Sequence, residues 1–393
     1  MDSLARELLL RRKQVQENGW KSWLESELIR ARNQRMGFER QWYLNLAFNS
    51  GRQYVAPVNV PGYGFRLTSP KSPPHRVRLV INITRKATRK ELAKLTSSKP
   101  IPTVVPATNE DEDQTAAVVS EKVLKAQFGD SKFNQTYLWW VLWGVVTSAS
   151  FMKSYYDPTE PDYDCMTLPE RPVIMGQQIT DEIMNMPNFN PQFKKYLETP
   201  QPAKGKVCYT HVSPFQLYVG DLMTPDIEDQ PWVLHVMTKT PEWVQKKFGF
   251  RPTCDAKTSM TVLDAATVIS KGGETGLMDA VLVKEMWVKP GTHADFPKGG
   301  MFTVINEKVV QSFTEWPLPF QGYPFYQYRG IPTGGFYDDS VVQDLIPLQK
   351  EYNKTRSQMV EIKNVMGKPK LMYEKGSVNP RMITTEVGQS MPY

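Results

Sequence analysis

The segment 340–366, SVVQDLIPLQKEYNKTRSQMVEIKNVM, carries the strongest periodic signal in the chain. Ser340 and Gln343 have the S-x-x-Q spacing of a helix N-terminal capping box. The pattern predicts a helical rod of about 35–40 Å at 1.5 Å per residue, with a kink near Pro347. A seam so narrow predicts packing against other helices, and copies of the same rod would line a ring. The seam residues recur at alternating steps of three and four: Leu345, Leu348, Tyr352, Thr355, Met359, Ile362 and Met366.

The segments before this rod alternate between helical and strand periodicity in no regular order, which predicts an α+β fold. Pro and Gly predict an extended loop over 55–76 and an irregular insertion over 157–205. A short helix is expected from the N-cap pair Thr240-Pro241 to Gly249. Longer helices are expected over 4–14, 17–48, 82–97 and, apolar and buried, 134–148. Strands are expected over 151–156, 207–218, 232–237 and 281–288, with a hairpin over 301–313 around Asn306-Glu307.

Charge is unevenly distributed along the chain. The 393 residues contain 48 Lys and Arg against 41 Asp and Glu, a formal net charge of +7. Residues 1–99 hold 20 basic and 7 acidic side chains, so they carry +13 and the remainder −6. Such asymmetry indicates contact with a polyanion, for which nucleic acid is the obvious candidate. The alternative is a solvated helix face with internal ion pairs, such as Glu27 with Arg30 and Arg35 with Glu39.

The usual catalytic signatures are absent from the sequence: GxxxxGK[ST], GxGxxG, HExxH and GxSxG do not occur. An acidic group, Asp157, Glu160, Asp162 and Asp164, lies beside Cys165, but no His joins it, and a solvated insertion explains it more simply. We therefore expect no metal, no cofactor and no enzymatic activity. The most apolar run, 137–146, is ten residues long and too short for a bilayer, which needs about 20. The His and Cys residues are scattered, without metal-ligand spacing: His75, His211, His235, His293, Cys165, Cys208 and Cys254.

Four segments taken in order resemble the portal proteins of tailed bacteriophages. The first is an aromatic-rich helix ending RQWYLNLAFNSGRQY, and the second is the basic helix, Pro-bounded strand and acidic-started helix of RLVINITRKATRKELAKLTSSKPIPTVVPATNEDEDQTAAVVSEKVLKAQF. The third is WWVLWGVVTSASFMKSYYDP followed by VSPFQLYVGD, and the fourth is GIPTGGFYDDSVVQDLIPLQKEYNKTRSQMVEIKNVMGKPKL. No single motif is diagnostic, but the ordered set spans most of residues 38–371.

The resemblance implies a portal-protein fold. On that mapping, residues 1–338 form the wing domain, 339–366 the first stem helix and 367–393 the start of the clip. A second stem helix and a crown are not recognisable. The resemblance implies a homo-oligomeric ring, usually a dodecamer, at one capsid vertex of the virion, assembled in the cytoplasm of the host bacterium. Its channel would pass double-stranded DNA without sequence specificity. Further partners would be the major capsid protein and scaffold, the terminase large subunit, and a head–tail adaptor or tail proteins, with no membrane partner.

Basic side chains on and after the rod are candidates for facing the phosphates of DNA in the channel. Such contacts must be sparse, because strong phosphate pairing would hold DNA that has to slide. Salt bridges between subunits are the alternative role for each one. The candidates are Lys350, Lys354, Arg356, Lys363, Lys368, Lys370 and Lys375.

Two other classes of function stay open. A metal-dependent DNA-processing enzyme such as a nuclease would use scattered carboxylates with magnesium and exist as a monomer or dimer. A peripheral membrane protein would use the basic amphipathic start, in which Leu4, Leu8 and Leu9 oppose the basic run 11–13. In the portal interpretation this start contacts capsid, tail or a neighbouring subunit instead.

Overall fold

The computed structural model describes residues 2–60, 64–71, 73, 76–97, 103–129, 131–167, 173–174, 177–178, 201–254, 281–320 and 322–367. Side chains are described from residue 14 onward within these ranges, apart from 59–66, 127, 129, 131 and 158–204. The expected α+β class is confirmed, since helices and antiparallel sheets contribute together. The start of the proposed clip, the side chains of the insertion and those of the amphipathic start lie outside the described residues.

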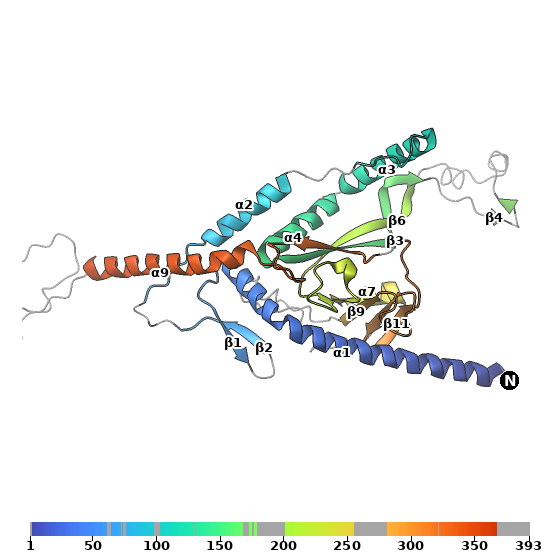
Figure 1. Ribbon diagram of the computed structural model, residues 1–393, viewed down its shortest axis with the longest axis horizontal. Coiled ribbons are helices and arrows are strands. Elements are labelled where there is room, and N and C mark those ends of the chain that lie inside the picture. Colours follow the sequence, from blue (N-terminus) through green and yellow to red (C-terminus); the bar gives the residue numbers. More distant parts are fainter. Residues whose placement is uncertain are drawn as a thin grey trace, which may run out of the picture.

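The described chain begins and ends with a long helix, and shorter helices and strands lie between these two (Figure 1). The helices are α1 (Asp2–Ser50), α2 (Ile83–Ser97), α3 (Asp111–Gly129), α4 (Ser131–Thr147), α7 (Pro241–Phe248) and α9 (Val341–Gly367), with a 3-10 turn at Ile227–Asp229. The strands are β1 (Ala56–Val60), β2 (Gly64–Thr68), β3 (Ala149–Thr167), β4 (Val173–Ile174), β5 (Gln177–Gln178), β6 (Gln201–Val212), β7 (Leu217–Val219), β8 (Trp232–Lys239), β9 (Val281–Val288), β10 (Gly300–Ile305), β11 (Lys308–Phe313) and β12 (Phe325–Arg329).

Two antiparallel sheets form the centre of the molecule. The larger has the order β11-β10-β9-β8-β7, and the smaller has the order β12-β3-β6. Helix α1 packs on one face of the larger sheet through Trp20, Leu24 and Ala31. The smaller sheet lies over the opposite face, where Lys153 of β3 reaches Glu285 of β9. Helix α4 covers the outer side of the smaller sheet, so the body is built in four layers (Figure 1).

Helix α1 is continuous over its whole length and contains Gly19 and Gly37, so the expected division into two helices over 4–14 and 17–48 is wrong. No atom lies within 4 Å of a Cβ built on either glycine, which places both at open positions of the helix surface. Because the flanking apolar side chains are buried against the sheet, packing stabilises the helix across its glycines. The helix ends before Gly51, which has a left-handed φ of 95°.

Arg35 of α1 fixes the helix to the start of β7. Its guanidinium, 2% exposed, donates to the carbonyl oxygens of Pro214, Phe215 and Leu217 at 2.6–3.1 Å. It also pairs with Glu39 at 2.5 Å, the intrahelical pair expected from the sequence. Burial alone would lower the pKa of Arg35, but interactions with Tyr218, Glu39 and Tyr337 raise it, so the buried guanidinium stays charged.

Local signals are confirmed at two further places. Thr240 accepts a hydrogen bond from the Trp243 amide at the start of α7, and Gly249 ends it in the left-handed conformation. Asn306 and Glu307 turn the β10–β11 hairpin, both with positive φ.

The irregular insertion expected over 157–205 is wrong at both ends, where β3 continues to Thr167 and pairs with β6 from Gln201.

Two other sequence expectations differ from the structure. The expected loop over 55–76 is wrong between residues 56 and 68, where β1 and β2 form an antiparallel hairpin. The expected burial of the 134–148 helix holds only for its second half. Leu138 and Trp139 are 42% and 54% exposed, whereas Val145 and Val146 are buried. The first half of α4 exposes one side to water, while Phe133 on its other side is buried against Tyr209 of β6.

Candidate functional site

Helix α9 begins inside the protein core. Ser340 accepts a hydrogen bond from the Gln343 amide at 3.2 Å, as the capping-box spacing predicts. The Ser340 hydroxyl also accepts from the Asn45 side chain of α1 at 2.8 Å. Val342 and Ile346 are buried in the core shared by α1, α4 and both sheets. The base of the helix is therefore held firmly, while its distal half extends away from the body (Figure 1).

A ladder of hydrogen bonds joins one face of α9 to the extended segment 77–83. Every second backbone amide of that segment donates to a side chain of α9. Each successive acceptor lies one helical turn closer to the start of α9. Two extended residues advance about 6.6 Å and four helical residues about 6.0 Å, so the two repeats nearly match and the chains run antiparallel. The four bonds are Val77 N to Glu361 Oε1 (2.9 Å), Leu79 N to Ser357 Oγ (3.0 Å), Ile81 N to Asn353 Oδ1 (3.2 Å) and Ile83 N to Gln349 Oε1 (2.9 Å).

The ladder ends by capping α2. Asn82 is the N-cap of α2 and accepts from the Arg85 amide at 2.9 Å. The side-chain oxygen of Gln349 accepts from the amides of Ile83 and Thr84, which would otherwise lack partners at the helix start. Gln349 and Asn353 are 3% and 2% exposed, so these amides and carbonyls are paired away from water. Helix α9 therefore positions α2 through polar rather than apolar contacts.

The predicted apolar seam lies on a different face of α9 from this ladder. At about 100° per residue the seam is centred roughly 130° around the helix from the buried ladder residues. Leu345 and Tyr352 are half-buried, and Thr355 is exposed. The remaining seam side chains are largely exposed: Leu348 69%, Met359 54%, Ile362 58% and Met366 75%. The seam therefore contributes little to packing within one chain, and its packing against other copies stays a prediction.

The four described basic candidates on α9 do not form one stripe. Residues two positions apart on a helix lie about 200° apart, so Lys350 and Lys354 flank one side of the ladder and Arg356 and Lys363 the other. Lys350 lies over the ring of Phe48 at 5.6 Å, and Arg356 over its own neighbour Tyr352 at 5.4 Å. Lys354 lies 3.7 Å from Glu351. Lys368, Lys370 and Lys375 lie outside the described residues.

A buried charged cluster joins the two sheets. Lys153 Nζ lies 2.5 Å from Glu285 Oε1, which also accepts from Trp287 Nε1 at 2.6 Å. Burial alone would raise the pKa of Glu285, but Lys153, His235 and the two hydrogen bonds lower it to about 2. His235 is the cross-strand partner of Glu285, and burial followed by the charge of Lys153 lowers its pKa to about 3. In the described part of the chain the Nδ1 atom of His235 has no hydrogen-bond partner.

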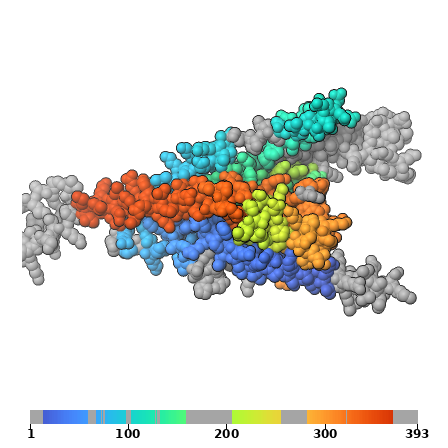
Figure 2. All heavy atoms as spheres, viewed as in Figure 1, coloured from blue at the N-terminus to red at the C-terminus, as the bar shows by residue number. Residues whose placement is uncertain are grey.

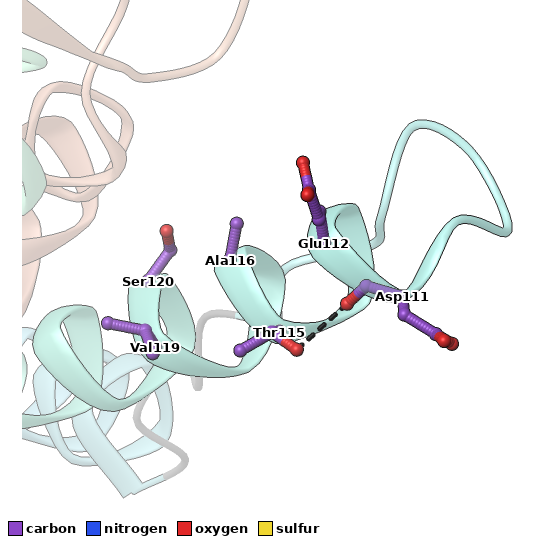
Figure 3. Close-up of a pocket in the computed structure, with 6 residues that line it drawn as sticks. All are labelled: Asp111, Glu112, Thr115, Ala116, Val119 and Ser120. Carbon is purple, nitrogen blue, oxygen red and sulfur yellow. Dashed lines mark hydrogen bonds between the residues drawn. The ribbon is translucent and has the colours of Figure 1, made fainter.

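A concave surface beside α3 is lined by residues of that helix alone, among them Asp111, Thr115 and Val119 (Figure 3). Thr115 donates to the Asp111 carbonyl oxygen at 2.8 Å, which occupies its hydroxyl within the helix. Because the described lining comes from one helix face, this surface lacks the opposing walls of a small-molecule pocket. Within the described ranges, no group of three His, Cys, Asp or Glu side chains is arranged to hold a metal ion. Of the helices searched there, none combines the length and the apolar character that crossing a bilayer requires.

The sequence reading missed the ladder residues Gln349, Asn353 and Ser357. Their signal was a polar side chain at every fourth position of a helix, which also describes a solvated face. A scan against models of protein families and a search of curated proteins found no match for this chain. The function of this chain is therefore inferred from its sequence pattern and its geometry.

Proposed function

We propose that this protein is the portal subunit of a tailed bacteriophage: a ring-forming conduit for double-stranded DNA at one capsid vertex. In this proposal twelve copies associate head to tail, with α9 as the stem helix and residues 1–338 as the wing. The ring is the docking site for the terminase large subunit, the head–tail adaptor or tail proteins, and the surrounding capsid. The chain acts as a structural part of the virion rather than as an enzyme.

The observation that carries the proposal is the exposed heptad seam of α9. Met359, Ile362 and Met366 leave apolar surface in water in a single chain, and a contiguous apolar stripe on a soluble protein marks an interaction surface. The same helix is anchored at its base by Val342 and Ile346 and along one side by the ladder. A rod held rigidly on one face and apolar on another is suited to packing between two like neighbours.

Ring closure follows from the type of contact. When two different surfaces of the same chain meet, the contact is heterologous, and repeated rotation either closes a ring or continues as a filament. The anchored base fixes the angle at which each rod leaves its body, so all copies would present the same rotation. A few cations on each rod, such as Lys363, would then give DNA a weakly attractive wall along which it can slide.

The experiment compares assembly of the unchanged chain with two charge-matched variants by native mass spectrometry. Met359→Glu/Ile362→Glu places two carboxylates on the seam, and Gln358→Glu/Asn364→Glu places two at exposed positions off it. Both pairs lie on the exposed half of α9, so neither disturbs the core of one chain. We expect the unchanged chain and the off-seam variant to form the ring and the seam variant to dissociate.

Equal assembly of both variants would refute the role of the seam. A chain that stays monomeric or dimeric in every form would refute the ring itself. Such a chain should next be incubated with magnesium and plasmid DNA, because cleavage would establish the nuclease class instead.

A further inference from the structure

The basic residues in the first quarter of the chain differ in whether they form ion pairs. On α1, the pairs expected from the sequence are formed: Arg30 with Glu27 at 2.6 Å and Arg35 with Glu39 at 2.5 Å. Those cations are neutralised within their own helix. On α2, by contrast, a set of cations forms no ion pair with any described residue: Arg85, Lys86, Arg89 and Lys90. Among residues 1–99 that the structure describes, α2 therefore carries the densest group of cations without an ion pair, four within six positions.

These four cations share one face of α2. At about 100° per residue they fall within an arc of roughly 140°. Thr84 and Thr88, which are 1% and 4% exposed, lie on the opposite face, where α2 packs on α9 and α4. The nearest acid on the helix, Glu91, is half-buried and pairs with Lys94 at 3.2 Å. Figure 2 shows α2, in light blue, at the surface beside α9.

We infer that this cationic face of α2, made by Arg85, Lys86, Arg89 and Lys90, is a binding surface for the phosphate backbone of double-stranded DNA. Arg85 and Lys90 are separated by about 7.5 Å along the helix axis. Successive phosphates of one strand lie about 3.4 Å apart along the duplex axis. The face therefore spans two to three phosphates on a strand, and long flexible side chains reach further to either side. The inference holds for a single chain and does not depend on the ring.

The surroundings of the face favour duplex DNA over other polyanions. Proteins that bind single strands stack bases on aromatic side chains between the cations, and α2 carries no aromatic residue. A helix that binds a membrane surface inserts an apolar face below its cations, whereas the face of α2 opposite its cations holds the buried Thr84 and Thr88. Contacts from side chains to phosphates carry no base readout, so binding is expected to be independent of sequence.

The rigid seat of α2 supports the same role. Its first turn is capped by Asn82 and Gln349, and its buried face is fixed to α9 by the Thr84 hydroxyl, which donates to Gln349 at 3.2 Å. The four cations are therefore presented on a helix whose backbone is held at both its start and its buried face. An anchored helix loses little backbone entropy on binding, which favours contact with an extended polymer.

The experiment measures binding of the full chain to a fluorescent DNA duplex of about 30 base pairs by anisotropy, between about 50 and 200 mM NaCl. The α2 variant is Arg85→Gln/Lys86→Gln/Arg89→Gln/Lys90→Gln. The control is Arg32→Gln/Lys122→Gln/Lys246→Gln/Lys308→Gln, which removes the same charge from exposed positions on other elements. Glutamine has a helix propensity close to that of Lys and Arg, and circular dichroism checks that both variants are folded.

We expect the α2 variant to bind the duplex at least about tenfold more weakly and the control to change far less. Each lost phosphate contact lowers the slope of log affinity against log salt by about 0.9, so the α2 variant should lose about 2–4 from that slope. The double variant Arg85→Lys/Arg89→Lys keeps the charge and should retain binding.

Three results would overturn the inference. The first is an equal loss in both quadruple variants, which would show an effect of net charge alone. The second is unchanged DNA binding with α2-dependent binding to vesicles of anionic lipid, which would place a membrane on this face. The third is unchanged DNA affinity together with a change in particle mass, which would place a second copy of the chain there. A failed ring with intact, α2-dependent DNA binding would refute the proposed function and leave this inference standing.

Discussion

Replacing Lys153 with Met should leave Glu285 as an unpaired charge between the two sheets. The two side chains are 10% and 9% exposed, and their charged atoms lie 2.5 Å apart. Methionine fills nearly the same volume as lysine but offers no charge and no donor. Glu285 would keep the hydrogen bond from Trp287 Nε1 at 2.6 Å, which alone cannot replace the ammonium. Removing one partner of a buried ion pair costs far more than the pair contributes, because the other charge stays desolvated.

The magnitude follows from the pKa of Glu285. That pKa lies at about 2 in the folded chain against an ordinary value of 4.5, and a difference of one in pKa corresponds to about 1.4 kcal/mol. The surroundings therefore stabilise the ionised carboxylate by about 3 kcal/mol at neutral pH, and Lys153 is the first favourable contributor. Breaking a buried pair typically destabilises by about 3–5 kcal/mol. We expect the free energy of unfolding of Lys153→Met to fall by about 3 kcal/mol at pH 8.

The loss of stability in Lys153→Met should depend on pH. In the unchanged chain the lowered pKa of Glu285 contributes stability above pH 4.5, which is lost as the pH falls toward 2. Without Lys153, burial raises the pKa of Glu285 above its ordinary value. The folded variant therefore takes up a proton as the pH falls below neutral. A proton on His235, whose pKa Lys153 also lowers, acts in the same direction. The stability gap between variant and unchanged chain should therefore shrink from pH 8 to pH 5.

Urea unfolding followed by tryptophan fluorescence measures the gap at each pH. The double variant Lys153→Met/Glu285→Gln is the control, because its glutamine keeps an oxygen for Trp287 and carries no charge. It should be more stable than Lys153→Met at pH 8 and show a nearly constant gap. A gap for Lys153→Met that is below about 1 kcal/mol, or that widens as the pH falls, would refute the reasoning.

Three further predictions concern the ladder, a helix cap and acid stability. Asn353→Leu removes the acceptor for the Ile81 amide and should lower the free energy of unfolding by about 1–3 kcal/mol. The control Lys354→Gln, at an exposed position, should change that free energy by less than about 0.5 kcal/mol. Equal urea midpoints for the two variants would contradict the ladder. Thr240→Ala should cost about 1 kcal/mol by removing the α7 N-cap, and thermal unfolding that is unchanged would argue against the cap. His235 has a folded pKa of about 3, below its ordinary 6.5, so its contribution to stability is complete above pH 6.5 and is lost as the pH falls. His235→Leu should therefore flatten the decline in urea midpoint between pH 6.5 and 4.5. A decline as steep as that of the unchanged chain would show that His235 does not cause it.

Elements with short-range signals could be predicted from the sequence. The cap at Thr240 and the stop at Gly249 depend on residues within one turn of the helix. The turn at Asn306 depends on a left-handed conformation that Asn adopts readily. The rod itself was predicted over 340–366 because its seam repeats through many residues, and the helix is observed over Val341–Gly367.

The contacts that position the candidate site could not be predicted, because they join distant parts of the chain. Ile81 and Asn353 are 272 residues apart, and Lys153 and Glu285 are 132 apart. Nothing in the local sequence of segment 77–83 distinguishes a strand in a sheet from an extended chain paired with helix side chains. The sequence of residues 1–99 likewise does not show which of its cations form ion pairs, so the cationic face of α2 could not be predicted.

In the proposed assembly, identical chains associate through α9 into a closed ring. The most direct measurement is the mass of the purified particle by native mass spectrometry, with two-dimensional class averages of the same sample. Twelve chains of 45.1 kDa predict a particle of roughly 540 kDa with a central hole. A particle of one or two chains at every concentration tested would contradict the account.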